Sequence, residues 1–182
     1  MNSLQGHFLV AAAHQLDPNF ARTVILVVEH SDDGAFGVIV NCPKEERGRH
    51  RRHRSIRRLS AAARFSFGGP VTGPLMAVHR NAFLGERQLL PGVFFSGKEK
   101  NVLTLMRQAE QPLKVFAGYA GWGAAQLELE VEQGIWRAAP ATAEQVFSGS
   151  DDLWAQVSRQ ASRLQLRIML NLKHIPDDPL LN

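Results

Sequence analysis

The chain has 182 residues, of which 45% are hydrophobic and 21% are charged, a composition typical of one globular domain with a buried core. Its longest apolar runs, residues 8–13 and 24–28, are far shorter than the roughly 20 residues of a membrane helix. We also expect no signal peptide, since the first run lacks a basic flank. With the single cysteine Cys42, which excludes an internal disulfide, these features predict one cytoplasmic domain over residues 1–182 that does not contact a membrane.

The net charge of +4 comes from one segment of the chain. Residues 44–64 contain nine Lys or Arg and two Glu, a local charge of +7, so the rest of the chain carries −3. Residues 44–54 show no apolar periodicity and are expected to form a mobile basic loop. Such a loop can bind nucleic acid weakly and nonspecifically. Its candidate contacts are Arg47, Arg49, Arg51, Arg52 and Arg54. The alternative is a solvated loop without a nucleic-acid contact, because interleaved aromatic residues and a helix-turn-helix pattern are missing.

The first forty residues predict three strands. An apolar run at residues 6–12 fits a buried strand, and the β-branched run at residues 23–29 fits a central strand. Residues 31–34 end in Asp33-Gly34, a pair that favours a tight turn, and a third strand is expected at residues 35–41. The second and third strands should therefore form a β-hairpin.

The middle of the chain predicts shorter elements. Two helical turns are expected at residues 55–63, and short strands at residues 64–67 and 75–79 enclose the loop Gly68-Gly69-Pro70-Val71. After a polar loop, residues 93–96 fit a strand. Ser96 or Gly97 should then cap a helix over residues 98–109.

The most distinctive stretch is the sequence GYAGWGAAQLE at residues 118–128. A strand over residues 113–119 is expected to end there in a tight turn that the glycines permit. Residues 126–132 alternate like a half-buried strand, yet they are rich in Leu, Gln and Glu, which favour a helix. The residues alone leave this segment open between strand and helix.

The last part of the chain predicts a strand and two helices. The strand covers residues 135–139, one helix runs from Thr142 to about Phe147, and another begins at Asp151 and Asp152. Two prolines make residues 174–182 an irregular tail. Strands and helices interleave without regular βαβ units, and this order indicates an α+β fold.

Several short motifs resemble the AlgH/YqgE family of bacterial proteins. The resemblance covers about residues 4–160 and rests on GxFL at 6–9, DPxFxRTV at 17–24, EH at 29–30, GAxG at 34–37, NxP at 41–43, GGPV at 68–71, His79 and the stretch at 118–128. It implies an α+β fold in which a bent, bifurcated β-sheet forms a partial barrel with helices packed around it, and a helix at residues 124–132. The family is similar to proteins named as transcriptional regulators, which implies a non-enzymatic regulatory or interaction protein with a protein partner.

A small-ligand-binding protein or an enzyme is the other class of function that we consider. Gln126 and Glu128 lie at the start of the implied helix, where free N–H groups favour a polar or anionic ligand. Tyr119 and Trp122 lie beside them in the sequence, and Gly68 and Gly69 could offer backbone N–H groups. His30 and His79 could meet Glu128 in a metal or acid–base site. These ligand-binding candidates are Tyr119, Trp122, Gln126, Glu128, His79, Gly68 and Gly69.

Each candidate also has a structural interpretation. The glycines can permit a sharp turn, the aromatic residues can fill the core, and each histidine can be held by hydrogen bonds. The sequence contains no paired metal-ligand spacing and no nucleophile motif. We therefore expect no catalytic residue, no metal and no cofactor.

Overall fold

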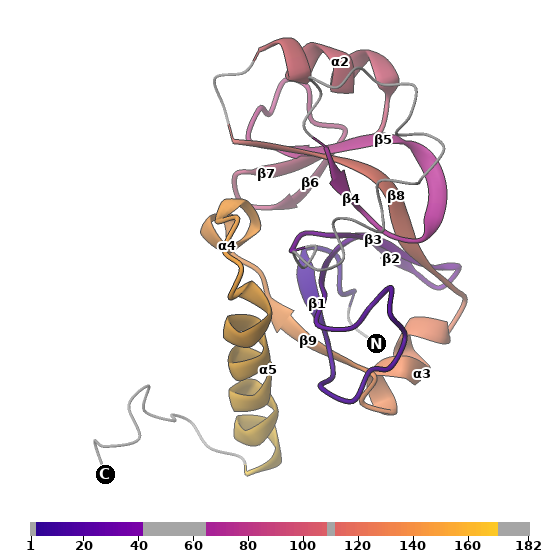
Figure 1. The fold of residues 1–182 in the computed structure, drawn as a ribbon, viewed down its shortest axis with the longest axis vertical. Coiled ribbons are helices and arrows are strands. Elements are labelled where there is room, and N and C mark those ends of the chain that lie inside the picture. The colour runs from indigo at the N-terminus through magenta and orange to yellow at the C-terminus, as the bar shows by residue number, and fades with distance from the viewer. Residues whose placement is uncertain (1–2, 42–64, 109–111, 171–182) are drawn as a thin grey trace.

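One curled sheet of nine strands forms the framework of the protein (Figure 1). The structure is a computed structural model, and it describes residues 3–41, 65–108 and 112–170. The strands are β1 (His7–Ala11), β2 (Val24–Ser31), β3 (Gly34–Ile39), β4 (Ser66–Phe67), β5 (Val71–His79), β6 (Arg87–Leu90), β7 (Val93–Ser96), β8 (Leu113–Gly123) and β9 (Trp136–Pro140). Their order is β6-β7-β5-β8-β3-β2-β1-β9, and β4 pairs with β8 outside this path.

The long strand β8 divides the sheet into two parts. Its first half pairs with β5 from Leu113 to Ala117 and, in parallel, with β4 at Phe116 and Ala117. Its second half pairs antiparallel with β3 from Ala120 to Gly123. One strand therefore belongs to both parts of the sheet, and the expected α+β fold with a bent, bifurcated sheet is confirmed.

Four helices pack around the sheet in the described ranges. They are α2 (Glu99–Arg107), α3 (Gln126–Glu132), α4 (Ala143–Phe147) and α5 (Leu153–Met169). The predicted helix at Thr142 is confirmed, since Thr142 forms a capping box with Gln145. The helix implied at residues 124–132 is confirmed as α3, so helix propensity outweighs the alternating pattern there.

Three apolar clusters form the core. The largest fills the inside of the curled sheet and is closed by α4 and α5; its members include Phe8, Leu26, Phe116, Leu153 and Val157. A second cluster lies under α3 and includes Leu9, Ile25, Trp122, Leu127 and Trp136. A third lies under α2 and includes Ala77, Val102, Leu105 and Val115. Burial of each such aliphatic or aromatic side chain contributes about 2 kcal/mol.

Several predicted boundaries differ from the structure. The hairpin of β2 and β3 is confirmed, but its turn consists of Asp32 and Asp33, and Gly34 already belongs to β3. Strand β5 begins at Val71 rather than at Leu75, and a bulge separates its first pair from the rest of its ladder with β8. Residues 87–90, which were expected to be loop, form β6, whose outward polar side chains conceal its strand pattern.

The predicted cap of α2 is wrong. The N-cap residue is Lys98, and no side chain at the cap position bonds to the helix. Instead, the carboxylate of Glu86 accepts hydrogen bonds from the N–H groups of Gly97, at 3.3 Å, and Lys98, at 3.0 Å. Glu86, twelve positions before Lys98, therefore takes the place of the cap that was expected from Ser96 or Gly97. The helix predicted at residues 55–63, the basic loop at 44–54 and the tail at 174–182 lie outside the described residues.

Side chains close the seam where the curled sheet returns on itself. Arg87 at the edge strand β6 donates to Gln5 Oε1, at 3.1 Å, and to Glu29 Oε2, at 3.0 Å. The side chain of Gln5 in turn donates to the carbonyl oxygen of Gln88, at 3.2 Å. Gly6 allows this closure, because its φ is +74° and a Cβ atom there would collide with the carbonyl oxygen of Leu89.

Candidate functional site

The junction between β8 and α3 contains most of the candidate residues. Strand β8 does not end at Tyr119 as predicted but continues through the glycines to Gly123. The chain then turns at Ala125, which has a φ of +58° and provides no side-chain cap. The Oε1 atom of Gln126 accepts a hydrogen bond from the N–H group of Gly123, at 3.0 Å. Gln126 therefore ties the first turn of the helix to the end of the strand.

Glu130 is the centre of a hydrogen-bond network on the inner side of α3. Its Oε2 atom accepts hydrogen bonds from the indole N–H groups of Trp122 and Trp136, each at 2.8 Å. Its Oε1 atom accepts a third bond from Gln126 Nε2, at 2.9 Å. The two indole rings are buried and meet edge to face at 5.9 Å. One carboxylate thus satisfies two buried indole donors and fixes the position of α3.

His30 and Glu128 form a pair on the same face of the sheet. The two side chains meet at 2.8 Å between Nε2 and Oε1, and the His30 side chain is only 4% exposed. Because His30 Nδ1 accepts from the N–H group of Leu4, at 2.9 Å, the ring proton lies on Nε2 and is donated to Glu128. Both ring nitrogens of His30 are therefore engaged within the protein.

The charge of Glu128 is stabilised by its position in the first turn of α3. Its own backbone N–H group, followed by the hydrogen bond from His30, lowers the pKa of this carboxyl below its ordinary value. The Glu128 carboxylate therefore already accepts a hydrogen bond from its own backbone N–H group, one of the helix-start donors that we expected to be open to an anionic ligand.

His79 lies in a different part of the molecule. It pairs with Leu113 at the start of β8, whereas Gln126 contacts Gly123 at the end of that strand, about 30 Å away along the chain. Its Nδ1 atom accepts from the N–H group of Asn81, at 3.2 Å, and its Nε2 atom bonds to Ser96 Oγ, at 2.9 Å. The structure therefore does not bring His79 together with Glu128.

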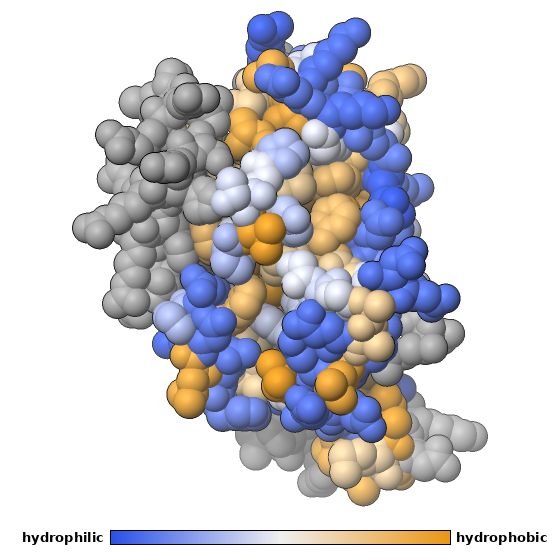
Figure 2. All heavy atoms as spheres, turned by 90° about the vertical axis from the view of Figure 1, so that its right-hand side faces the viewer, coloured by the Kyte–Doolittle hydropathy of each residue, from blue (hydrophilic) through white to orange (hydrophobic). Residues whose placement is uncertain are grey.

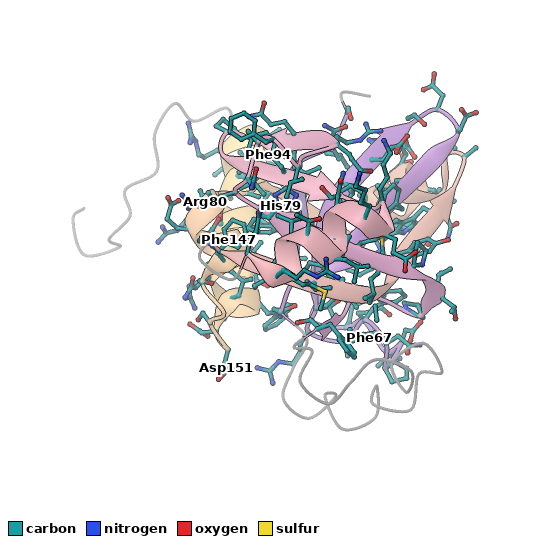
Figure 3. All side chains as sticks on the ribbon, turned by 90° about the horizontal axis from the view of Figure 1, so that it is seen from above. Phe67, His79, Arg80, Phe94, Phe147 and Asp151 are labelled. Atoms are coloured by element: carbon teal, nitrogen blue, oxygen red, sulfur yellow. The ribbon has the colours of Figure 1, made fainter. Side chains whose placement is uncertain are left out.

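The surroundings of His79 favour a neutral, structural imidazole. Its ring stacks on Phe94 at 6.3 Å, and Arg80 lies beside Phe147 at 5.5 Å (Figure 3). Ser96 passes the hydrogen bond on to the carbonyl oxygen of Leu84. Burial lowers the pKa of His79, and the attraction of the Glu86 carboxylate opposes this only partly.

Gly68 and Gly69 serve the close approach of two chain segments. The N–H group of Gly68 donates to the carbonyl oxygen of Ala117, and its own carbonyl oxygen accepts from Ile39, each at 2.9 Å. A Cβ atom on Gly69 would collide with the backbone of Tyr119. Tyr119 itself meets Phe36 edge to face at 6.0 Å. The backbone groups of Gly68 are thus used inside the fold.

A depression near this junction lies at the tip of the β2–β3 hairpin. It measures about 320 Å³ and is lined by Glu29, Ser31, Asp33, Gly34, Ala35, Phe36 and Trp122. Gln126, Glu128 and His79 are not part of this lining. Figure 2 shows the face that carries β5, β8 and α3, where pale and tan residues occupy the middle and hydrophilic residues lie to their right and below them.

The described residues contain no group of three or more His, Cys, Asp or Glu side chains that could hold a metal ion. No helix in these ranges is long and apolar enough to span a membrane. The nucleic-acid candidates Arg47, Arg49, Arg51, Arg52 and Arg54 lie outside them, so binding through these arginines stays a prediction.

Sequence reasoning missed the residues that organise this junction. Glu130 and Trp136 were not among the candidates, and His30 was considered only as a partner of a site with His79. The four-residue spacing of Gln126 and Glu130 indicates that they share a helix face. No local signal links Glu130 to Trp136, because that contact depends on how α3 and β9 pack.

Comparison with known proteins agrees with the fold. A family model described as AlgH-like matches residues 8–164. A UPF0301 protein of Chlorobaculum tepidum is 33% identical over 168 residues, covering 85% of this chain and 84% of the relative. A UPF0301 protein of Rhizobium meliloti is 36% identical over 159 residues, covering 80% and 79%. These names state neither a reaction nor a ligand.

Two solved structures share the architecture. The solution structure of the AlgH protein from Pseudomonas aeruginosa has a TM-score of 0.66 and 27% sequence identity, and the match covers 96% of this chain and 97% of that chain. The crystal structure of protein DIP2367 from Corynebacterium diphtheriae has a TM-score of 0.65 and 27% identity, covering 87% of both chains. The match to AlgH extends over almost the whole chain.

Proposed function

The chain belongs to the AlgH-like family, and from this membership we propose that it is a non-enzymatic interaction protein with a regulatory role in the cytoplasm. The polar side chains on the first two turns of α3 support the proposal. Gln126, Glu128 and Glu130 hold α3 on the sheet through hydrogen bonds to Gly123, His30 and the two indoles. Their engagement inside the fold suits a rigid scaffold that presents a surface to a partner.

One observation carries the proposal: the apolar stripe of α5 continues beyond the core. Leu153, Val157 and Ala161 are at most 2% exposed. Ile168 follows on the same helix face and is 73% exposed, because the sheet no longer covers the end of α5. The neighbouring Met169 is 74% exposed.

Two further apolar side chains extend this surface. Leu166 and Leu170 are 46% and 56% exposed on the same two turns of α5. Exposed large apolar side chains gathered at one end of a helix are typical of a surface that a partner covers. A partner protein would remove these side chains from water, which supplies a favourable free energy of association.

Complementation of a deletion strain tests the proposal. The strain would receive the wild-type gene, Ile168→Asp or Glu128→Gln, and RNA abundance across the genome would be compared. We expect the Glu128→Gln variant to restore the wild-type profile, because an amide can keep the hydrogen bond from His30. We expect Ile168→Asp to fail, since a charge in the interface opposes its burial.

Leu16→Asp provides the matched control, because Leu16 is 90% exposed but lies outside α5. This variant should complement as well as the wild type. Loss of complementation by Glu128→Gln with a normal result for Ile168→Asp would contradict the proposal and favour a reactive site at the junction. Thermal unfolding of each purified variant ensures that the comparison is made between folded proteins.

A further inference from the structure

Strand β9 lies at one end of the sheet and pairs only with β1 among the described strands. The N–H group of Ala12 donates to the carbonyl oxygen of Ile135, at 3.0 Å, and this bond continues the ladder of the two strands. In an antiparallel pair every second residue bonds to the neighbouring strand, so the main-chain groups of Arg137, two positions after Ile135, face β1. The N–H and C=O groups of Trp136 and Ala138 therefore point to the outer edge of the sheet.

This outer edge is open at Trp136 and Ala138. In the described part of the chain, no group donates to or accepts from their outward main-chain atoms. The carbonyl oxygen of Pro140 also points outward, but it accepts a hydrogen bond from Gln160 Nε2, at 2.9 Å. The opposite end of the sheet differs, because the first residues of the chain cover β6 there. An edge with unpaired donors and acceptors is a template for a further strand.

Helix α5 crosses the sheet and continues past this edge (Figure 1). Near its start, Trp154 Nε1 donates to the carbonyl oxygen of Ala11 in β1, at 2.9 Å. Two turns later, Ser162 contacts Arg137 in β9. Ile168 lies about 9 Å farther along the helix axis, roughly two strand spacings, and is 73% exposed. The end of α5 therefore overhangs the position that a strand next to β9 would take.

Arg137 carries a positive charge at this edge. Its Nη1 atom donates to Ser162 Oγ, at 2.8 Å, and its Nε atom is buried without a hydrogen-bond partner. No carboxylate forms an ion pair with Arg137 in the ranges that the structure describes. A residue opposite Arg137 on an added strand would lie about 5 Å away between Cβ atoms, close enough for an ion pair. An acidic residue at that position would therefore stabilise the added strand.

We propose that the outer edge of β9 binds an extended segment of a partner protein as an antiparallel strand, the orientation of every pair from β6 to β9. The segment carries Asp or Glu opposite Arg137 and apolar residues two positions to each side. These side chains face α5, where Leu164 and Ile168 cover the apolar ones. This role rests on the proposed function and states how a partner engages the end of α5. Strand addition takes its affinity from main-chain hydrogen bonds and its specificity from alternate side chains.

A second copy of the chain fits this edge less well. Two copies of β9 related by a two-fold axis at Arg137 would pair Trp136 of one copy with Ala138 of the other. The two Arg137 side chains would then lie directly opposite one another, and like charges at such positions are destabilising. Residues 174–182 of the same chain also fit less well, because their two prolines lack the N–H groups that a strand donates.

Binding of designed peptides to the full chain tests the inference. A fluorescent nine-residue peptide would carry Glu at its centre, Val or Ile at every second position from it and Thr between them, and fluorescence anisotropy would measure its affinity. N-methylation of the two Thr residues beside Glu removes the N–H groups that face Trp136 and Ala138, and it should weaken binding about tenfold or more. N-methylation of the central Glu changes only an outward N–H group. That peptide is the matched control and should bind as the unmodified one does.

The charge of Arg137 is tested separately. A peptide with Lys in place of Glu should bind about two- to fivefold more weakly, the contribution of one exposed ion pair. Arg137→Glu should reverse this preference, whereas Arg107→Glu in the last turn of α2 should leave it unchanged. Hydrogen exchange of the wild-type chain locates the site, with slower exchange of the Trp136 and Ala138 amides when the peptide is bound. Thermal unfolding would verify that both variants fold.

Three results would overturn the inference: no binding of any peptide, equal affinity of the peptide methylated beside Glu, or unchanged exchange of the Trp136 and Ala138 amides. Slow exchange of these amides in the free chain, with a dimer in sedimentation, would assign the edge to a second copy instead.

The proposed function fails separately. If Ile168→Asp abolishes complementation while Arg137→Glu complements fully and N-methylation has no effect, a partner covers α5 without adding a strand. Full complementation by Ile168→Asp would refute the proposed function whether or not the peptide binds.

Discussion

The carboxylate of Glu130 accepts hydrogen bonds from the indoles of Trp122 and Trp136, two side chains that are 7% and 2% exposed. An indole N–H group can only donate a hydrogen bond, so inside the core it needs an acceptor within the protein, which here is this carboxylate. The network therefore connects α3 to β8 and β9 at one point. Its loss would leave two buried donors without an acceptor.

We predict that Glu130→Ala lowers the free energy of unfolding by about 2–4 kcal/mol, since each buried donor left without a partner costs about 1–3 kcal/mol. Glu130→Gln should lose less, because its amide oxygen still accepts. Urea unfolding followed by tryptophan fluorescence measures both. Glu132→Ala on the exposed side of the same helix is the control, and an equal loss there would show that the effect is one of helix propensity.

His79 is the residue for which we predict a pH effect. Burial lowers its pKa, so the unfolded chain takes up a proton near the ordinary value of 6.5 while the folded protein resists it. Stability should therefore fall as the pH decreases below 6.5, by up to about 1.4 kcal/mol per pH unit.

The dependence on pH should be shallower in His79→Gln than in the wild type. Urea unfolding between pH 5 and 7.5 provides the comparison. His14→Gln, which changes an exposed histidine, should keep the wild-type slope. A wild-type slope in His79→Gln as well would mean that another group causes the loss of stability.

Strand β8 explains the glycines of the distinctive stretch. Gly118 has a φ of +77°, and a Cβ atom there would collide with the carbonyl oxygen of Gly69. Gly34, at the other side of the strand, allows the carbonyl oxygen of Trp122 to approach. Gly123 differs, since a Cβ atom would meet only Gln126 Oε1 at 3.8 Å. Gly118 thus allows two chain segments to approach, and all three glycines of the stretch lie within β8 rather than in the predicted turn.

We predict that Gly118→Ala lowers the free energy of unfolding by roughly 3 kcal/mol or more, because overpacking adds to the cost of a positive φ. Gly134→Ala is the matched control: its φ is +74°, but no atom lies within 4 Å of the added Cβ. That variant should lose only about 1–2 kcal/mol. Equal losses in urea unfolding would show that β8 and the Gly69 loop can separate at no cost.

The seam between β6 and the start of the chain closes the molecule. Arg87 and Glu29 are 41% and 45% exposed there, so their ion pair adds little stability by itself. The close approach of Gly6 to Leu89 is the tighter contact. It joins the last strand of one part of the sheet to the first residues of the other.

We predict that Gly6→Ala opens this seam. The free energy of unfolding of this variant should be about 2–3 kcal/mol lower than that of Gly92→Ala. Gly92 is the matched control, because it has a similar φ of +72° but no atom near its added Cβ. Hydrogen exchange would locate the change, with faster exchange at the amides of β6 and residues 4–6. Unchanged exchange at these amides would contradict a closing role for Gly6.

Much of the fold could be predicted because its signals are local. The β-branched run of β2 and the capping box at Thr142 act within a few residues, and both elements formed where expected. The hairpin also formed, although its turn lies one residue earlier than the predicted Asp33-Gly34 pair. The candidate site could be predicted only in part. His30 and Glu128, which do meet, are 98 residues apart in the sequence. His79 was assigned to the same metal or acid–base site because it is a histidine, and no local signal shows that it lies elsewhere.

The sequence by itself determined the fold class, the hairpin, the helix at Thr142 and the apolar stripe of α5, because propensity and periodicity act along the chain. Tertiary structure decided where the polar residues meet. The register between β5 and β8 places His79 beside the start of β8, whereas Glu128 lies in α3, which follows the end of β8. The packing of α3 brings Glu130 to two indoles. The sheet also ends before α5 does, and it is this difference in length that leaves Ile168 exposed beyond the outer edge of β9.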